Sequence, residues 1–202
     1  MPEQIQITLF TFDELSEESQ QRVIEAFQED YELDYSIIYD EFIIDMSERY
    51  GADIKDDKIN WTGFWSQGDG ASFTCKFNNE VIRPILEKEL NEEQISILKE
   101  IDADMEASSV RIGYQYSHEN TVLGKLSLYY GDYYYYRIVE INEIHEIMEN
   151  KLTEIIREEC RNLYRQLEDF YEEEMTDDAI REKIRQHYPA CRYREDGTVF
   201  IR

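Results

Sequence analysis

Carboxylates and aromatic rings alternate in two segments, and this is the pattern of residue types best suited to binding chemistry. In the first segment the candidate residues are Glu29, Asp30, Tyr31, Asp34, Tyr35, Asp40 and Glu41. In the second they are Glu168, Asp169, Tyr171, Glu172, Glu173 and Glu174. Carboxylates attract the ammonium and guanidinium groups of a partner, and tyrosine rings add contact area at little entropic cost. These residues are therefore candidates for binding a basic protein.

Acids placed on helices can also imitate nucleic acid. Helix neighbours three or four positions apart lie roughly 5–6 Å apart, and duplex DNA carries one charge per roughly 1.7 Å of its axis. Rows of carboxylates could thus enter the Lys/Arg groove of a nucleic-acid-binding protein. A solvated helix face is the alternative interpretation, but such faces usually interleave lysine with glutamate. Residues 1–48 contain a single Lys or Arg, Arg22.

The net charge supports the same class of partner. The 202 residues include 46 Asp and Glu against 21 Lys and Arg, a formal charge of −25. Residues 1–50 hold 14 acids and 2 bases, residues 140–178 hold 14 and 4, and the last 24 residues hold 3 and 6. A charge this far from zero steers the molecule toward basic surfaces and away from nucleic acid and anionic lipid. We expect a basic protein partner, with no direct contact to nucleic acid or membrane.

A tryptophan-rich segment with a glycine-rich turn is a second candidate site. Its candidate residues are Trp61, Trp65, Gln67 and Asp69. On a strand, Trp61, Gly63 and Trp65 would share one face and form an aromatic platform. The Asp69 carboxylate can bind the amides of its own turn. The alternative is a core hairpin whose turn requires these residues, and the loop lacks the lysine of a phosphate-binding loop.

The sequence GFWSQGDGASF at residues 63–73 resembles a short signature of uncharacterised proteins from bacteriophages and prophages. The resemblance covers about a dozen residues. It implies a viral context, in which small acidic proteins often bind and block host factors. It implies no reaction and no catalytic residue.

Support for catalysis or metal binding is thin. The histidines His118, His145 and His187 lie far apart, and no nucleophile-elbow or zinc-protease motif occurs. A histidine base beside Asp69 would be the arrangement of a small hydrolase, which we keep as an alternative. The three cysteines lack paired spacing, which favours reduced thiols over a disulfide framework or a zinc site. We therefore predict no catalytic residue, no metal and no cofactor.

The hydrophobic patterns predict an α+β fold, with an antiparallel sheet of about five to six strands packed by helices and a long acidic helix near the C-terminus. The expected strands are residues 4–10, 58–67, 71–77, 110–117, 121–130 and 133–138, with a small hairpin at 192–202. The expected helices begin at Ser16 and span 36–50, 79–90, 92–105, 140–174 and 177–188. Ser16 is expected to cap its helix, and Gly51 to end the next one.

We expect a single α+β domain over residues 1–202, with 140–202 as a candidate helical subdomain. The apolar stripe of 140–174 would face a core or a partner helix. No apolar run is long enough to cross a bilayer and no basic-then-apolar leader begins the chain, so the expected location is the host cytoplasm. Our leading hypothesis is a phage-type inhibitor that blocks a nucleic-acid-binding surface of a host defence protein, such as a CRISPR or restriction complex. A homodimeric regulatory or antitoxin-like protein is the alternative.

Overall fold

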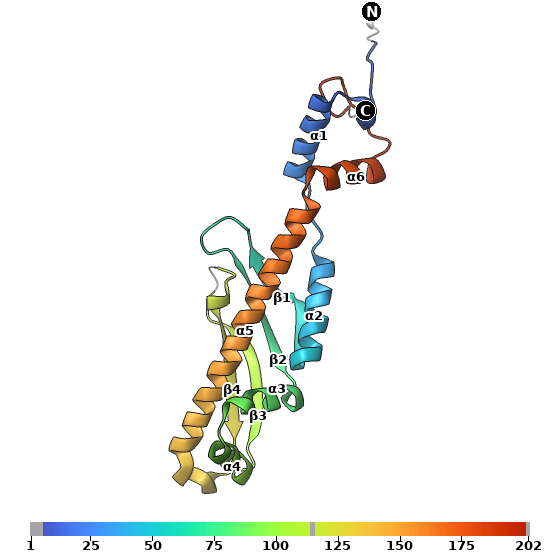
Figure 1. Ribbon diagram of the computed structural model, residues 1–202. Coiled ribbons are helices and arrows are strands. Elements are labelled where there is room, and N and C mark those ends of the chain that lie inside the picture. Colours follow the sequence, from blue (N-terminus) through green and yellow to red (C-terminus); the bar gives the residue numbers. More distant parts are fainter. Residues whose placement is uncertain (1–5, 114–115, 201–202) are drawn as a thin grey trace, which may run out of the picture. The chain divides into compact units, whose positions relative to one another are not determined.

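A computed structural model describes residues 6–113 and 116–200 (Figure 1). The fold is α+β, and its antiparallel sheet has the order β1-β2-β3-β4. The strands are β1 (Ala52–Thr62), β2 (Gly70–Phe77), β3 (Asp104–Arg111) and β4 (Val122–Tyr129). The helices are α1 (Glu17–Asp30), α2 (Ser36–Tyr50), α3 (Asn79–Leu86), α4 (Glu92–Glu100), α5 (Ile138–Glu174) and α6 (Asp177–His187). None of the helices in these two ranges has the length and apolar character required to cross a membrane.

The chain divides into two compact units. Unit 1 combines residues 1–34 with 169–202, and unit 2 is residues 35–168. Helix α5 begins in unit 2 and ends in unit 1. The division differs from the expected subdomain at 140–202, because the N-terminal segment belongs with the C-terminal one.

Helix ends follow the expected capping chemistry. The Ser16 hydroxyl accepts a hydrogen bond from the Ser19 amide at 3.2 Å, which caps α1. Gly51 has φ +66° and ends α2, and its amide donates to the Ser47 carbonyl at 2.9 Å. The predicted cap at Ser16 and the predicted stop at Gly51 are both confirmed.

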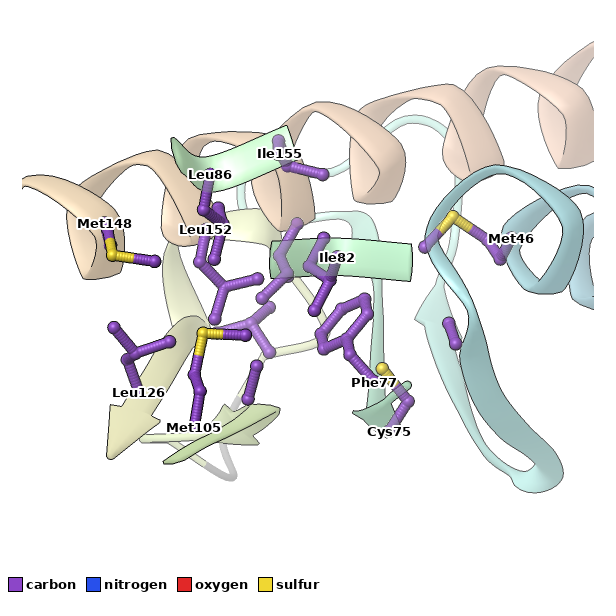
Figure 2. Close-up of a cluster of buried hydrophobic side chains, with 14 of the residues drawn as sticks. Met46, Cys75, Phe77, Ile82, Leu86, Met105, Leu126, Met148, Leu152 and Ile155 are labelled. Carbon is purple, nitrogen blue, oxygen red and sulfur yellow. The ribbon is translucent and has the colours of Figure 1, made fainter. Parts of the chain in front are cut away.

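The core of unit 2 lies between the sheet and the helices. Alternating residues of β2, namely Ala71, Phe73, Cys75 and Phe77, are buried, as period-two patterning requires. Figure 2 shows side chains of β3 and β4, including Met105 and Leu126, pointing toward Met148 and Leu152 of α5. The predicted apolar stripe of α5 is confirmed, and it packs against its own chain.

The sheet has four strands instead of the expected five to six. The segment 133–138, expected as a strand, forms a short 3-10 helix (Asp132–Arg137) that leads directly into α5. The amide of Tyr134 bonds the Gly131 carbonyl at 3.1 Å, so the chain is already turning helically where a strand would begin. Tyr135 has 77% of its surface exposed, whereas the neighbouring Tyr134 is half-buried and packs against the core of unit 2.

Other expected strand boundaries were wrong, and β1 covers Ala52–Thr62 instead of 58–67. Residues 6–9 form no strand, and Phe10 makes only an isolated bridge to Tyr193; residues 4 and 5 lie outside the described part. Near the C-terminus the expected small hairpin does form: Tyr193 and Val199 make an antiparallel bridge, and the Arg194 amide donates to the Thr198 carbonyl at 2.9 Å, while residues 201 and 202 lie outside the described part. Helix α4 stops at Glu100, soon before Asp102 takes φ +47°, so β3 begins at Asp104 and not near 110.

Candidate interaction surfaces

An aromatic platform, defined as Tyr35, Trp61, Phe64, Trp65 and Tyr164, lies in unit 2 where β1 ends. The ring centroids of Tyr35 and Trp61 are 4.8 Å apart, and those of Trp61 and Phe64 are 5.0 Å apart in a stacked arrangement. Phe64 contacts Trp65 edge-on at 5.9 Å and Tyr164 at 5.7 Å. Geometries of this kind stabilise aromatic pairs beyond the area they bury.

The turn after β1 brings these rings together. Strand β1 ends at Thr62, and Gly63 takes φ +33°. The prediction that Trp61, Gly63 and Trp65 share one strand face was therefore wrong. Asp69 accepts hydrogen bonds from the amides of Trp65 (3.0 Å) and Ser66 (2.5 Å). This confirms that Asp69 binds the amides of its own turn, and it assigns that carboxylate a structural role.

The two tryptophans differ in accessibility. Trp61 is half-buried, and its indole Nε1 donates to the Tyr39 hydroxyl at 2.7 Å. Trp65 is 75% exposed, and Gln67 is also exposed. Trp65 is therefore the ring of the platform that a partner could cover.

The structure divides the candidate acidic and tyrosine residues between the two units. Unit 2 contains Tyr35, Asp40, Glu41 and Glu168, together with the tryptophan segment. Unit 1 contains Glu29, Asp30, Tyr31, Asp34, Asp169, Tyr171, Glu172, Glu173 and Glu174. Asp40 and Glu41 lie on the exposed side of α2, whereas Asp169, Glu172 and Glu173 are exposed near the end of α5.

Within unit 1, one lysine joins two of the predicted residues. The ammonium of Lys183 lies 2.7 Å from a carboxylate oxygen of Glu174 and 4.8 Å from the ring centroid of Tyr31. Tyr31 in turn stacks on Phe27 at 4.9 Å. Glu174 and Tyr31 therefore stabilise unit 1, because a cation between a carboxylate and an aromatic face is attracted by both.

Unit 1 also contains a cavity of about 630 Å³ between α1 and the segment after α6. Asp30 and Tyr31 of the predicted residues line it, with Phe27, Tyr188 and Cys191. Sequence reasoning missed Tyr188 and Cys191 because they lie on either side of Pro189, just after the end of α6, where no periodic pattern shows which side chains face inward. The cavity makes Cys191 the cysteine best placed to meet a reagent from solution.

We expect the three cysteines to differ sharply in reactivity. Cys191 is half-buried, whereas burial raises the pKa of both the Cys75 and the Cys160 thiols to about 12. Because the thiolate is the reactive form, iodoacetamide at pH 8 should modify Cys191 first, as mapped by mass spectrometry. Cys75 and Cys160 should react only in denaturant. Rapid modification of Cys75 in the native protein would contradict its placement in the core.

The groups named for a hydrolase have other partners. Asp69 is hydrogen-bonded to its turn, while His118 Nδ1 lies 2.8 Å from a Glu119 carboxylate oxygen and 3.2 Å from the Asn120 amide. Across residues 6–113 and 116–200, no group of three or more His, Cys, Asp or Glu side chains is arranged to hold a metal ion.

Residues 27–177 match a family model described as "Domain of unknown function (DUF8835)". The chain belongs to this family. No curated protein and no solved structure matches the chain. The DUF8835 region contains all of unit 2, with the aromatic platform and α2, and it reaches into unit 1 at the ends of α1 and α5.

Proposed function

We propose that this DUF8835 protein is an acidic, phage-type inhibitor that binds a basic, nucleic-acid-binding surface of a host defence protein such as a CRISPR or restriction complex. The observation that carries the proposal is the pairing state of its carboxylates. In the described part of the chain, these predicted residues form no salt bridge: Glu29, Asp30, Asp40, Glu41, Glu168, Asp169, Glu172 and Glu173. Their charge is therefore available to a partner.

At least eleven of the 20 lysines and arginines in the two described ranges form an ion pair, Arg22, Arg165 and Arg185 among them. Arg49, Lys55, Lys58, Arg83, Arg137, Lys151, Arg161 and Lys183 each contact a carboxylate within 4.0 Å. Unit 1 has 19 acids and 7 bases, and unit 2 has 27 and 14, so each unit is strongly negative. Unpaired surface carboxylates raise the negative potential that speeds encounter with a basic surface.

The mechanism is occlusion without turnover. Carboxylates on the exposed sides of α2 and α5 would contact the lysines and arginines that otherwise hold phosphates, and Trp65 would add an aromatic anchor. In the stronger form of the proposal, the acids of one helix imitate a phosphate track. Both forms make binding sensitive to ionic strength, because charges across such an interface are partly solvated.

Charge reversal tests the proposal. A partner captured from bacterial lysate at low salt would be purified, and its association rate with each variant measured by stopped-flow fluorescence. We expect E172K/E173K or D40K/E41K to lower the rate by about tenfold at low salt, depending on which unit the partner contacts. Glu174 is left unchanged because its contact with Lys183 stabilises unit 1.

The control is E143K/E146K, which changes the net charge equally through two exposed residues elsewhere on α5. It should slow association much less than the most damaging of the test variants. Equal slowing by all three variants would show that net charge alone matters and that no acidic surface is specific. Binding that does not weaken between low and high salt would overturn the electrostatic mechanism altogether.

A further inference from the structure

Helix α2 carries apolar side chains on two sides. Phe42 and Met46 are buried in the core of unit 2. Ile44 nevertheless has 58% of its surface exposed, and Ile37 is exposed to a similar degree. Ile37, Asp40 and Ile44 are spaced by three and four positions, so they share a face of the helix. Packing in the core accounts for the apolar side chains of Phe42 and Met46, but not for those of Ile37 and Ile44 on this second face.

A groove lies between this face and β1. Its volume is about 600 Å³, its apolar part comes from Ile43, Ile44 and Ile54, and its acidic part from Asp40, Asp56 and Asp57. Strand β1 is at the edge of the sheet, and its register with β2 shifts between Ile54 and Ile59. The irregular stretch places aspartates opposite α2, and a break in the ladder of this kind commonly reshapes a sheet edge for a specific purpose.

The groove has an excess of negative charge. Its single cation, Lys55, is held by Asp53 at 2.8 Å, and Asp57 pairs with Lys58 at 2.7 Å. Within the two described ranges, Asp40 and Asp56 form no salt bridge. An occupant must therefore supply positive charge to the acids and apolar surface to the isoleucines. An acidic or a purely polar segment meets neither requirement.

We propose that this groove docks a basic amphipathic segment of the partner, in which apolar side chains alternate with lysine or arginine. This inference rests on the proposed function and names the contact surface in unit 2. Leucine-sized side chains of the segment cover Ile44 and the accessible part of Ile43, beside the buried Ile54. The aliphatic stems of its lysines or arginines extend along the groove, and their charged ends reach Asp40 and Asp56.

Two synthetic peptides of equal charge test the inference. One is a 14-residue Lys/Leu peptide with its leucines at helical spacing, and the other has serine at every leucine position. Their affinities for the full chain would be measured by fluorescence anisotropy at low salt. We expect the Lys/Leu peptide to bind at least about tenfold more tightly, because only it can bury apolar surface in the groove.

The variant Ile44→Ser should remove most of that difference while leaving the affinity for the Lys/Ser peptide unchanged. Ile112→Ser is the matched control, because Ile112 is also 58% exposed but lies outside the groove. Asp40→Asn should weaken the binding of both peptides. Thermal unfolding of each variant would verify that the fold is retained, as expected for exposed positions.

The outcomes separate the two proposals. If the peptides bind equally and Ile44→Ser changes neither, the groove inference is overturned while the acidic attraction stands. If Ile112→Ser has the same effect as Ile44→Ser, the apolar contact lies elsewhere and the groove inference also fails. If neither peptide binds at low salt, both the groove and the proposed function fail.

Discussion

Replacing Gly124 with valine is expected to lower the free energy of unfolding by about 3 kcal/mol, near the upper end of the usual effect of overpacking. A Cβ atom at Gly124 would lie 2.6 Å from Leu152 Cγ and 2.8 Å from the Thr153 backbone nitrogen. The Gly124 amide also donates to the Thr153 hydroxyl at 3.0 Å. Valine would therefore push α5 away from β4 in the middle of the core.

Thermal denaturation followed by circular dichroism measures this effect. A loss of about 3 kcal/mol corresponds to a fall in Tm of roughly 6–12 °C for a chain of this size. Gly131→Val is the control, since no atom beyond its two chain neighbours lies within 4 Å of a Cβ built there and its φ of −70° suits valine. An unchanged Tm in Gly124→Val would show that α5 and β4 are not in close contact.

Replacing Arg49 with methionine is expected to destabilise the protein by a similar amount. Glu159 of α5 is buried, with a side chain only 4% exposed, and Arg49 of α2 donates to its two oxygens at 2.7 and 3.3 Å. Tyr50 and Asn162 also donate to this carboxylate, at 2.9 and 3.0 Å. Removal of the arginine leaves a buried carboxylate without a cation, at an expected cost of about 3 kcal/mol.

A double variant distinguishes the lost charge pair from lost packing. In R49M/E159Q the amide no longer requires a cation, so we expect stability to recover part of the way toward the native value, as measured by urea unfolding. Lys55→Met, which removes an exposed pair, should change stability by less than about 1 kcal/mol. A double variant as unstable as the sum of its single changes would contradict a specific Arg49–Glu159 interaction.

The long-range periodicities of the sequence were sufficient to place the main helices. The apolar stripe of α5 recurs over many turns, so local irregularities could not obscure it. Ser16 and Gly51 were informative because a cap depends on chemistry within one turn. Strand β2 was predicted because its apolar residues Ala71, Phe73, Cys75 and Phe77 recur at every second position.

The segment of consecutive tyrosines shows where such reasoning fails. Tyrosine favours strands, but β-structure requires a neighbouring strand with which to pair, and the sequence does not show whether one is available. Here the segment pairs with no strand in the described part of the chain, and residues Asp132–Arg137 form a 3-10 helix that leads directly into α5. Similarly, the exposure of Ile37 and Ile44 on α2 could not be predicted, because periodicity alone does not reveal how much of a helix its sheet covers.

The residue types of the candidate site were predictable from the sequence, but the ion pairs that its carboxylates form were not. Acids and tyrosines could be identified, yet only the fold shows that Glu174 is held by Lys183 whereas Asp40 and Glu41 have no cation partner in the described residues. The groove beside α2 was missed because Asp56, Asp57 and Ile54 reach it through an irregular stretch of β1. A register shift of this kind leaves no periodic signal in the sequence.

The central proposal is tested most directly by competition with DNA. The partner captured at low salt would be bound to fluorescently labelled duplex DNA, and the DUF8835 protein titrated in while anisotropy is recorded. We expect the protein to displace the DNA, with an apparent affinity that falls steeply as salt rises and that weakens in D40K/E41K or E172K/E173K. Simultaneous binding of the DNA and the protein to the partner, with no displacement at any salt concentration, would contradict the proposal.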